Sequence, residues 1–483
     1  MGHEDLLPKS FNSKIVWKLT LNATIGSFLF GYNIGVFNSN QENIAATLGW
    51  GDNKDLYIST MAATLPLGGL VGSLYAGSLA NKVGCRKALM ITDFINICGS
   101  LFFLIPYTAT FGIGRLVTGY SSGSFSTLCP LYIGEISPPE VMGTMGSLTA
   151  LIIALGVLVA FILALPLPTG DYNSDVFNYW WMFMFVFQAF FALTQLFILW
   201  KVYRLDTPIR YLHKDIEEKA LESLQQVYTE EEANKTLEKL KFSRNDRSTL
   251  SEMDSVETAG KDQNLKNDED FTYSELICCV KPIRKKIRLG IAISFLQVAG
   301  GVDALFTYTA KIFRELGGGV FESRIYTAVF GLANLASVVV VIYIVEKLKR
   351  RTLLIFGNAG MGIAMAFLGI FASILSDAGP IPPLFFMFLY VFAFSNGIGT
   401  ITYVYCGEIL TSRAMSICMA INWFMIAFVI FTFPHMVALM TIGVSFWVFG
   451  VVCGIGILYF LIEFVETKGL DAEQIKAAFD KYK

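Results

Sequence analysis

Charged side chains are scarce in this sequence of 483 residues. Asp, Glu, Lys and Arg together make up 16% of it, whereas hydrophobic residues make up 54%. A typical soluble domain is about 25% charged. So little charge cannot cover the surface of a water-soluble globule of this size, which excludes a soluble enzyme. We therefore expect a surface that faces the lipid bilayer.

Other functional signals are also missing. A net charge of −2 provides no basic surface for nucleic acid. The sequence contains no nucleotide-binding loop, no cluster of metal ligands and no nucleophile beside a base, so we expect no enzyme, no nucleotide partner and no cofactor. The 8 cysteines lack the spacing of a disulfide framework. Residues 1–14 are short and polar and do not have the pattern of a cleaved signal.

What the sequence does contain is a series of apolar stretches of about 20 residues, each long enough to cross a bilayer as a helix. They predict an all-α membrane protein with twelve transmembrane helices in two pseudo-symmetric six-helix halves. The predicted spans are 15–37, 57–80, 88–107, 111–133, 144–167, 179–201, 288–312, 325–346, 352–374, 382–405, 414–439 and 441–463.

The polar segments divide the chain into five parts. The stretch at residues 215–240 places Leu and Val at helical spacing among many charges, which predicts short amphipathic helices in water. We therefore assign 1–14 to a tail, 15–203 to the first half, 204–287 to a linker, 288–463 to the second half and 464–483 to a second tail.

Basic residues in the short loops predict the orientation. They gather after the second and eighth spans, and such loops face the cytoplasm. We therefore expect both termini and the linker to be cytoplasmic, in a protein of the plasma membrane. The loop between the seventh and eighth spans disagrees, because it carries Lys311, Arg314 and Arg324. The residues that set the orientation are Lys82, Arg86, Lys87, Lys347, Lys349, Arg350 and Arg351.

The two halves repeat one another. The segment YIGEI at 132–136 recurs as YCGEI at 405–409, and the pair Arg86-Lys87 is matched by Arg350-Arg351. In the same order, DTP at 206–208 is matched by ETK at 466–468. Parallel repeats of this kind are typical of one class of secondary transporter, whose substrate site lies between the halves near the midplane.

These loops belong to a longer ordered set of segments. They include GSFLFGYNIGVFNSNQ in the first span, NKVGCRK after the second, GRLVTGYSSG and PLYIGEISP in the fourth, LQVAGGVDALFTY in the seventh and VETKG after the twelfth. Through them the chain resembles the sugar porters of the major facilitator superfamily, and most of all their facilitative glucose transporter branch. The resemblance implies uniport of a hexose or related neutral polyol by alternating access.

Acidic and basic residues at the cytoplasmic helix ends form a candidate inner gate. Ion pairs there would stabilise the state that is closed to the cytoplasm and would break when it opens. The sequence departs from the family pattern at Cys85 and Met142, where arginines are usual, which predicts fewer bridges in the first half. The gate residues are Arg86, Glu135, Glu346, Arg350, Arg351, Glu408, Arg413 and Glu466.

A neutral hexose needs amide and hydroxyl side chains and an aromatic face in an otherwise apolar cavity. The resemblance assigns this task to Gln297 and Asn334, with Tyr403 in place of a tryptophan and Asp303 in place of an asparagine. Ser126 in the fourth span completes the predicted lining. Three further positions of the site have lost their polar side chains, which makes glucose itself doubtful as the substrate. They are Phe161, Val298 and Ile426.

Two features favour different modes of action. Proton-coupled relatives carry an Asp in the first span where this chain has Asn33, which favours facilitated diffusion; Asp303 is a carboxylate within the membrane that could instead couple transport to protons. In the tenth span Thr400 and Thr402 replace usual prolines, so we expect a helix that bends less readily. A transport-incompetent sensor is therefore the second alternative. The expected partners are the bilayer and a small neutral solute.

Overall fold

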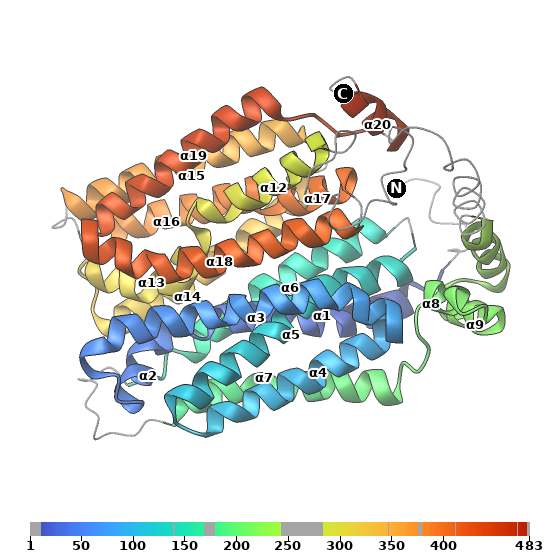
Figure 1. Cartoon of the computed structure of the whole chain (residues 1–483), viewed down its shortest axis with the longest axis horizontal. Helices are drawn as coiled ribbons and strands as arrows, with labels where there is room; N and C mark the ends of the chain where they lie inside the picture. Colours follow the sequence, from blue (N-terminus) through green and yellow to red (C-terminus); the bar gives the residue numbers. More distant parts are fainter. Residues whose placement is uncertain are drawn as a thin grey trace, which may run out of the picture.

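The computed structural model describes residues 11–138, 141–168, 179–242, 284–345, 347–374, 379–410, 412–470 and 472–480. Long helices dominate these residues and run side by side (Figure 1). The first half consists of α1 (Ser13–Gly35), α3 (Lys54–Val83), α4 (Cys85–Leu101), α5 (Thr108–Ile136), α6 (Met142–Leu163) and α7 (Trp180–Lys201).

The second half repeats this arrangement, with two of its helices in pieces. It consists of α12 (Arg284–Ala299) followed by α13 (Val302–Glu315), α14 (Val320–Ile344), α15 (Arg350–Ser373), α16 (Ile381–Phe394) followed by η7 (Ser395–Gly399) and α17 (Thr400–Ile409), α18 (Ser412–Met440) and α19 (Ile442–Glu463). The remaining short helices include α2 (Gln41–Thr47), α8 (Pro208–His213), α9 (Glu217–Val227) and α20 (Ala472–Asp480).

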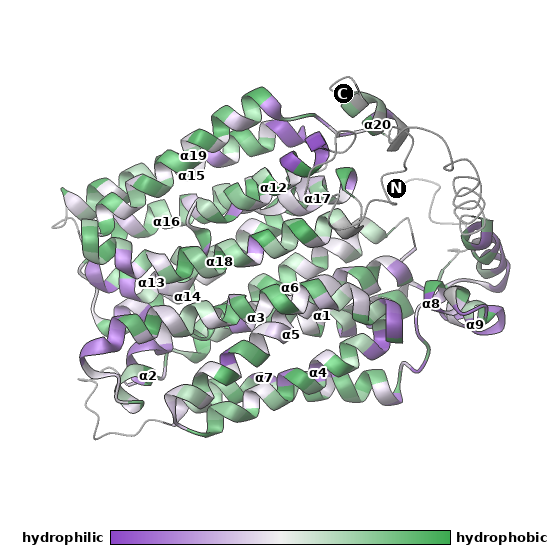
Figure 2. Cartoon of the chain, in the orientation of Figure 1, coloured by the Kyte–Doolittle hydropathy of each residue, from purple (hydrophilic) through white to green (hydrophobic). Residues whose placement is uncertain are grey.

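The bundle has two polar ends. We call the end where α1 begins, α7 ends and α12 begins the linker end, because α8 and α9 lie beside it (Figure 1). We call the opposite end the α2 end. Hydrophilic residues gather at these two ends and on α8 and α9, whereas the helix surfaces between them are mostly hydrophobic (Figure 2). This distribution matches a protein that spans a bilayer.

Ten helices among the described residues are long and apolar enough to cross a membrane. The two other long helices, α1 and α5, have 23 and 29 residues and so are long enough, but they are rich in Gly, Ser and Thr. More than half of the residues of each are buried. A helix enclosed by other helices does not need an apolar lipid-facing surface. The prediction of a twelve-helix membrane fold is confirmed.

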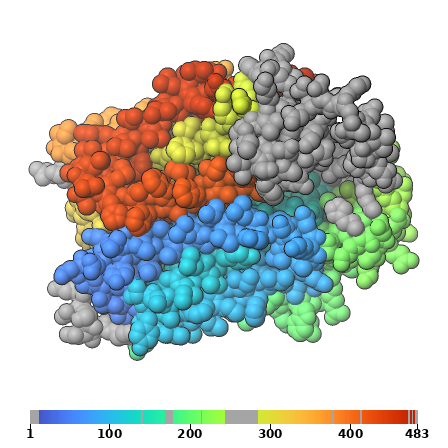
Figure 3. Space-filling model, in the orientation of Figure 1, coloured from blue at the N-terminus to red at the C-terminus, as the bar shows by residue number. Residues whose placement is uncertain are grey.

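Small residues set the closest helix contacts. A Cβ atom added to Gly72 of α3 would lie 2.0 Å from the backbone oxygen of Tyr120 on α5, and one added to Gly123 would lie 2.0 Å from that of Gly69. These glycines therefore let two backbones touch, as is usual in membrane bundles. Between the halves, α3 packs against α18 and α6 against α14, and Figure 3 shows the first pair meeting along the boundary.

Two glycines interrupt helices of the second half. Gly301, with φ of +94°, separates α12 from α13, and Gly397, with φ of −117° and ψ of −118°, breaks the tenth span within η7. The tenth span is therefore broken although Thr400 and Thr402 stand in place of its usual prolines. The break occurs without a proline. A Cβ atom added to Gly397 would lie 2.6 Å from the Cα of Gly357 on α15, so only glycine fits at this position.

Candidate functional site

A cluster of polar side chains forms around Gln297 near the break of the tenth span. Gln297 on α12 donates a hydrogen bond to the backbone oxygen of Gly399 (3.1 Å) and accepts one from Asn422 of α18 (2.9 Å). It also forms a hydrogen bond with Tyr403 of α17. Three separate helices and η7 thus bring amide and hydroxyl groups to one place.

Tyr403 is the exposed member of this cluster. It exposes 47% of its surface, and Gln297 and Asp303 are its neighbours. Asp303 lies in the first turn of α13, two residues after Gly301, and is within electrostatic range of Tyr403 and Tyr390. The unpaired N–H groups of a first helical turn favour a carboxylate. The cluster therefore brings together one acidic, one aromatic and two amide side chains.

The three apolar replacements lie on α6, α12 and α18. Phe161 of α6 is fully buried, and a Cβ added to Gly331 of α14 would lie 2.8 Å from its ring. Asn334 lies one turn further along α14 and is almost buried. Val298 is buried in the core, and Ile426 packs against the same core while partly exposed. The phenyl ring thus occupies volume between the halves.

Two polar residues differ from the sequence prediction of the site: Ser126 was predicted to line it, and Asn422 was not. Ser126 donates its hydroxyl to the backbone oxygen of Gly123 (2.7 Å), so it is engaged within its own helix. Asn422 was missed by sequence reasoning, which considered only Ile426 on α18. The two positions are four residues apart and therefore lie on the same helix face. The available signal was a single amide within the apolar run AINWFMIAF.

The first half carries a second buried polar group. Asn33 donates a hydrogen bond to Gln188 of α7 (2.7 Å), so this position holds a neutral pair. Arg115 of α5 is 2% exposed and donates to the backbone oxygens of Met61, Asn33 and Ala62 at 3.3–3.5 Å. Its guanidinium also lies 4.7 Å from the ring centre of Phe37. Backbone oxygens and an aromatic face therefore solvate this cation.

Ion pairs join the two halves at the α2 end. Lys311 of α13 pairs with Asp55 of α3 (3.0 Å), and Arg314 of α13 pairs with Glu42 of α2 (3.1 Å). Lys54 also binds Glu42 (2.7 Å). We call these five residues the α2-end latch. They explain why the loop after the seventh span is basic against the orientation rule, since its cations bind carboxylates of the other half.

Hydrogen bonds near the α2 end add to the ion pairs of the latch. Asn38 donates to the backbone oxygen of Phe306 (2.5 Å) and accepts from the N–H of Ala310 (3.1 Å). Gln41 donates to the backbone oxygen of Thr307 (2.7 Å). Arg324 of α14 donates to the backbone oxygens of Leu167 and Pro168 after α6. The structure is therefore closed at the α2 end.

The ionisation of Glu42 follows from these contacts. Burial alone would raise the pKa of Glu42, but the hydrogen bond from Lys54 and the charge of Arg314 outweigh burial, and the pKa is lowered. Glu42 is therefore ionised at neutral pH, as the latch requires.

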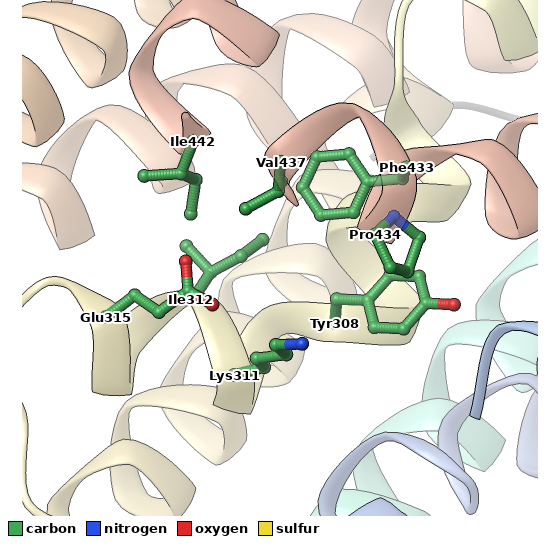
Figure 4. Close-up of a pocket in the computed structure, with 8 residues that line it drawn as sticks. All are labelled: Tyr308, Lys311, Ile312, Glu315, Phe433, Pro434, Val437 and Ile442. Atoms are coloured by element: carbon green, nitrogen blue, oxygen red, sulfur yellow. The ribbon is translucent and has the colours of Figure 1, made fainter. Parts of the chain in front are cut away.

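A crevice beside the latch is too small for a sugar. Figure 4 shows it between α13, α18 and the start of α19, with the side chains of Lys311 and Glu315 at one side and Phe433 and Val437 at the other. Its volume is about 10 Å³. A single water molecule needs about that much. The crevice therefore does not compete with the Gln297 cluster as a solute site.

At the linker end, each half has its own corner of polar contacts between described residues. In the second half Arg350 pairs with Glu408 of α17 (3.2 Å), and Thr467 donates to the other oxygen of Glu408 (2.6 Å). Glu466 accepts the backbone N–H groups of Arg350 (3.0 Å) and Arg351 (3.1 Å). We call this group the second-half corner.

The first half has an equivalent corner with different chemistry. Arg86 donates to the backbone oxygens of Leu199 and Tyr203 at the end of α7, and its own N–H binds Asp206 (3.1 Å). Glu135 accepts a hydrogen bond from the thiol of Cys85 (3.5 Å). Cys85 thus occupies the position of Arg350, and no arginine pairs with Glu135 among the contacts described.

The repeat therefore has a different register from the one read in the sequence. Arg86 corresponds to Arg351, which likewise donates to a backbone oxygen of the last helix of its half, that of Leu461. Cys85 then corresponds to Arg350. Two other gate candidates, Glu346 and the side chain of Arg413, lie outside the described residues.

Comparisons with known proteins agree with this architecture. A family model described as "Sugar (and other) transporter" matches residues 19–479. The chain is 28% identical over 480 residues to the major myo-inositol transporter IolT of Bacillus subtilis, covering 96% of this chain and 94% of that one. It is 26% identical over 505 residues to the D-xylose-proton symporter of Escherichia coli, covering 97% of each.

Other relatives broaden the range of solutes. The facilitated trehalose transporter Tret1-2 homolog of Drosophila simulans is 26% identical over 433 residues, or 86% of this chain and 81% of that one. Among solved structures, the proton:xylose symporter XylE bound to 6-bromo-6-deoxy-D-glucose has a TM-score of 0.76 at 25% identity, covering 96% of this chain and 99% of that one. The protein is thus a member of the sugar (and other) transporter family, with the major facilitator fold, and is a transporter rather than an enzyme.

Proposed function

We propose that the protein carries a hexose or a related neutral polyol across the membrane by facilitated diffusion. The observation that carries this proposal is the Gln297 cluster, in which Asn422, Tyr403 and Asp303 gather at the break of the tenth span. Amides and a carboxylate match the hydroxyl groups of a sugar, and Tyr403 offers a ring face. Similarity to transporters of xylose, trehalose and inositol supports the solute class.

The rearrangement that exposes this cluster to each side is rocking of the two halves. The latch supports this mechanism, because its ion pairs connect the halves at one end only and can break without disturbing either half. We propose that the α2 end faces the outside of the cell and that the linker end, with both termini, faces the cytoplasm. We further propose the plasma membrane as the location.

The three apolar replacements at predicted site positions favour a solute other than glucose. Phe161, Val298 and Ile426 offer no hydrogen bonds, and each missing bond costs about 0.5–1.5 kcal/mol. Because Phe161 is wholly buried against Gly331, it also narrows the space between the halves. A smaller polyol, or one with fewer hydroxyl groups on one face, is the better match.

Uniport is supported by the first half. Asn33 forms a neutral pair with Gln188 and cannot carry a proton. Proton-coupled transport is the second candidate, because Asp303 lies within the cluster and the E. coli relative is described as a proton symporter. In that case Asp303 would take up a proton together with the solute.

Uptake into proteoliposomes tests both candidates. We would measure labelled glucose, xylose and myo-inositol with and without a pH gradient, in the parent protein and in Gln297→Leu. Saturable flux of at least one solute that is indifferent to the gradient, and that falls at least tenfold in Gln297→Leu, is the expected result. Gln195→Leu, which removes a buried amide of the first half, is the matched control and should retain transport.

The alternatives give different outcomes. Gradient-driven accumulation that disappears in Asp303→Asn would establish symport in place of uniport. Solute binding measured by calorimetry without any flux would favour the sensor. Absence of both binding and flux for every sugar and polyol would overturn the proposed function.

A further inference from the structure

A carboxylate that no transport step uses lies inside the first half. Asp93 is in the middle of α4, is 0% exposed, and neither of its oxygens has a hydrogen-bond partner in the described part of the chain. Buried polar atoms are almost always hydrogen-bonded. A bare carboxylate in such a place would be very costly, so its charge must be neutralised.

The neighbouring groups do not supply a cation. Cys129 of α5 lies within electrostatic range of Asp93 and beside Ser27 of α1. Asn96, three residues after Asp93 on the same face of α4, is also fully buried and has no partner among the described residues. On α7, Gln195 donates to the backbone oxygen of Asn22 (3.0 Å). All of these groups are uncharged side chains or a thiol.

The cations of the surrounding helices lie far along the bundle axis. Asp93 is eight residues, or about 12 Å, from the start of α4 at the linker end. Arg115 is 21 residues from the linker end of α5, or about 31 Å, and already binds backbone oxygens. The charged residues of the helices packed here lie nearer the helix ends; they are Lys14 and Lys18 of α1, Lys54, Asp55 and Lys82 of α3, Arg86 and Lys87 of α4, Arg115 and Glu135 of α5, and Lys201 of α7.

Size decides what neutralises the carboxylate. A sphere the size of a water molecule reaches almost none of the surface of either oxygen, whether from outside or from an internal void. A bound water or an ion with its water shell would need such a void. Of the species that could neutralise a carboxylate, only a proton needs no space.

We propose that Asp93 is a proton-binding site of the first half, separate from the solute pathway. The carboxyl group carries its proton in the folded protein, and the unfolded chain releases it above about pH 4, where an ordinary Asp ionises. Because the helices around Asp93, which are α1, α3, α4, α5 and α7, all belong to the first half, rocking of one half against the other leaves this proton in place. The first half is therefore less stable at high pH than at low pH.

Infrared spectroscopy of the purified protein tests the site without a transport assay. The difference spectrum between the parent and Asp93→Asn should show the carbonyl band of a protonated carboxylic acid at pH 7, shifted in D2O. The same band should persist in Asp303→Asn, which isolates Asp93 from the carboxylate of the solute cluster. Absence of the band in the parent would overturn the proposal.

Thermal unfolding provides a second readout. Asp93→Asn and the parent should melt at the same temperature near pH 4, and the variant should melt a few degrees higher at pH 7.5, because only the parent loses a proton on unfolding. Asp52→Asn, which changes an exposed carboxylate at the α2 end, should show no such trend. A stabilisation of the parent by Na⁺ that Asp93→Asn lacks would replace the proton with a metal ion and overturn the proposal.

Should Asp93→Asn fail to fold, Asp303→Asn still decides the question. The carboxylic acid band of Asp303→Asn would then be followed from pH 5 to pH 9, and it should remain unchanged. Loss of the band between pH 5 and pH 7 would contradict a retained proton. Neither result depends on which solute the protein carries, so failure of the proposed function remains distinguishable from failure of this site.

Discussion

The two ends of the bundle use charge differently. At the α2 end Lys311 and Arg314 bind Asp55 and Glu42 across the boundary between the halves. At the linker end Arg350 binds Glu408 within one half, and Arg86 binds backbone oxygens within the other. Charge therefore holds the halves together at one end and makes each half rigid at the other. A rocking transporter needs both, because only a rigid half moves as a unit.

The linker end contains a smaller version of the same contrast. Its two corners have the same positions, but Arg350 stands in one and Cys85 in the other. The second-half corner thus has an ion pair where the first-half corner has only a thiol hydrogen bond. The duplicated geometry persists although one of its charges is lost.

The largest expected effect comes from breaking the second-half corner. Arg350→Gln leaves Glu408 without its cation and should destabilise the protein by about 2–3 kcal/mol, less than the roughly 3–5 for a fully buried pair. Thermal unfolding of the purified protein measures it. Arg288→Gln is the control, because Arg288 binds Glu463 (2.7 Å) in the same half but is half exposed; its cost should stay below about 1 kcal/mol. Equal losses would show that the corner has no special role.

The second-largest effect is expected from breaking the α2-end latch. Replacing both cations, in Lys311→Gln with Arg314→Gln, removes two partly exposed pairs worth about 0.5–1 kcal/mol each. The ratio of closed to open α2 end should therefore fall roughly 5- to 30-fold. A cysteine at Ser39, which is 8% exposed at this end, should react correspondingly faster with an impermeant maleimide. With Lys235→Gln, a change on the linker, the rate should not move; an unchanged rate in the latch variant would contradict its role.

Restoring the lost charge should sharpen the comparison between the corners. Cys85→Arg would place a cation beside Glu135 and should raise stability by about 0.5–1 kcal/mol. The gain should vanish when Glu135→Gln is added, which a double-mutant cycle measures. A gain that survives in the double variant would mean that the arginine acts through other contacts.

The smallest effect concerns pH. Because the pKa of Glu42 is lowered in the closed state, its contribution is complete above the usual value of about 4.3 and is lost as pH falls through the lowered pKa. The labelling rate of the Ser39 cysteine, divided at each pH by that of a fully exposed cysteine so that thiol ionisation cancels, should therefore rise only below about pH 4.5. When Glu42→Gln is added to the Ser39 cysteine variant, this corrected labelling rate should not change with pH in this range. Acceleration between pH 6 and pH 8 would assign the dependence to another group.

The sequence predicts the helices well because membrane burial requires long apolar runs, and ten of the twelve satisfy that requirement by composition alone. It did not predict the break at Gly397, because the reason for it is a close approach of Gly357 on another helix. A glycine shows that the backbone can bend. It does not show which neighbour makes the bend necessary.

Partners across the fold were the hardest feature to predict. Lys311 and Arg314 looked like exceptions to the orientation rule until Asp55 and Glu42 were seen opposite them. Asn422 was overlooked for a similar reason, since only its bond to Gln297 distinguishes it from an ordinary amide in an apolar run. Composition and periodicity give the identity and face of a residue but not its partner 100 or more positions away.

A covalent link across the α2 end tests whether solute uptake requires this end to open. Glu42→Cys with Arg314→Cys would be joined by a short, cleavable thiol reagent in proteoliposomes, and Arg288→Cys with Glu463→Cys would serve as the matched link within one half. We expect the first link to stop solute uptake until the reagent is cleaved, and the second link to leave uptake unchanged. Uptake that continues while the first link is fully formed would contradict it, because the α2 end would then not need to open.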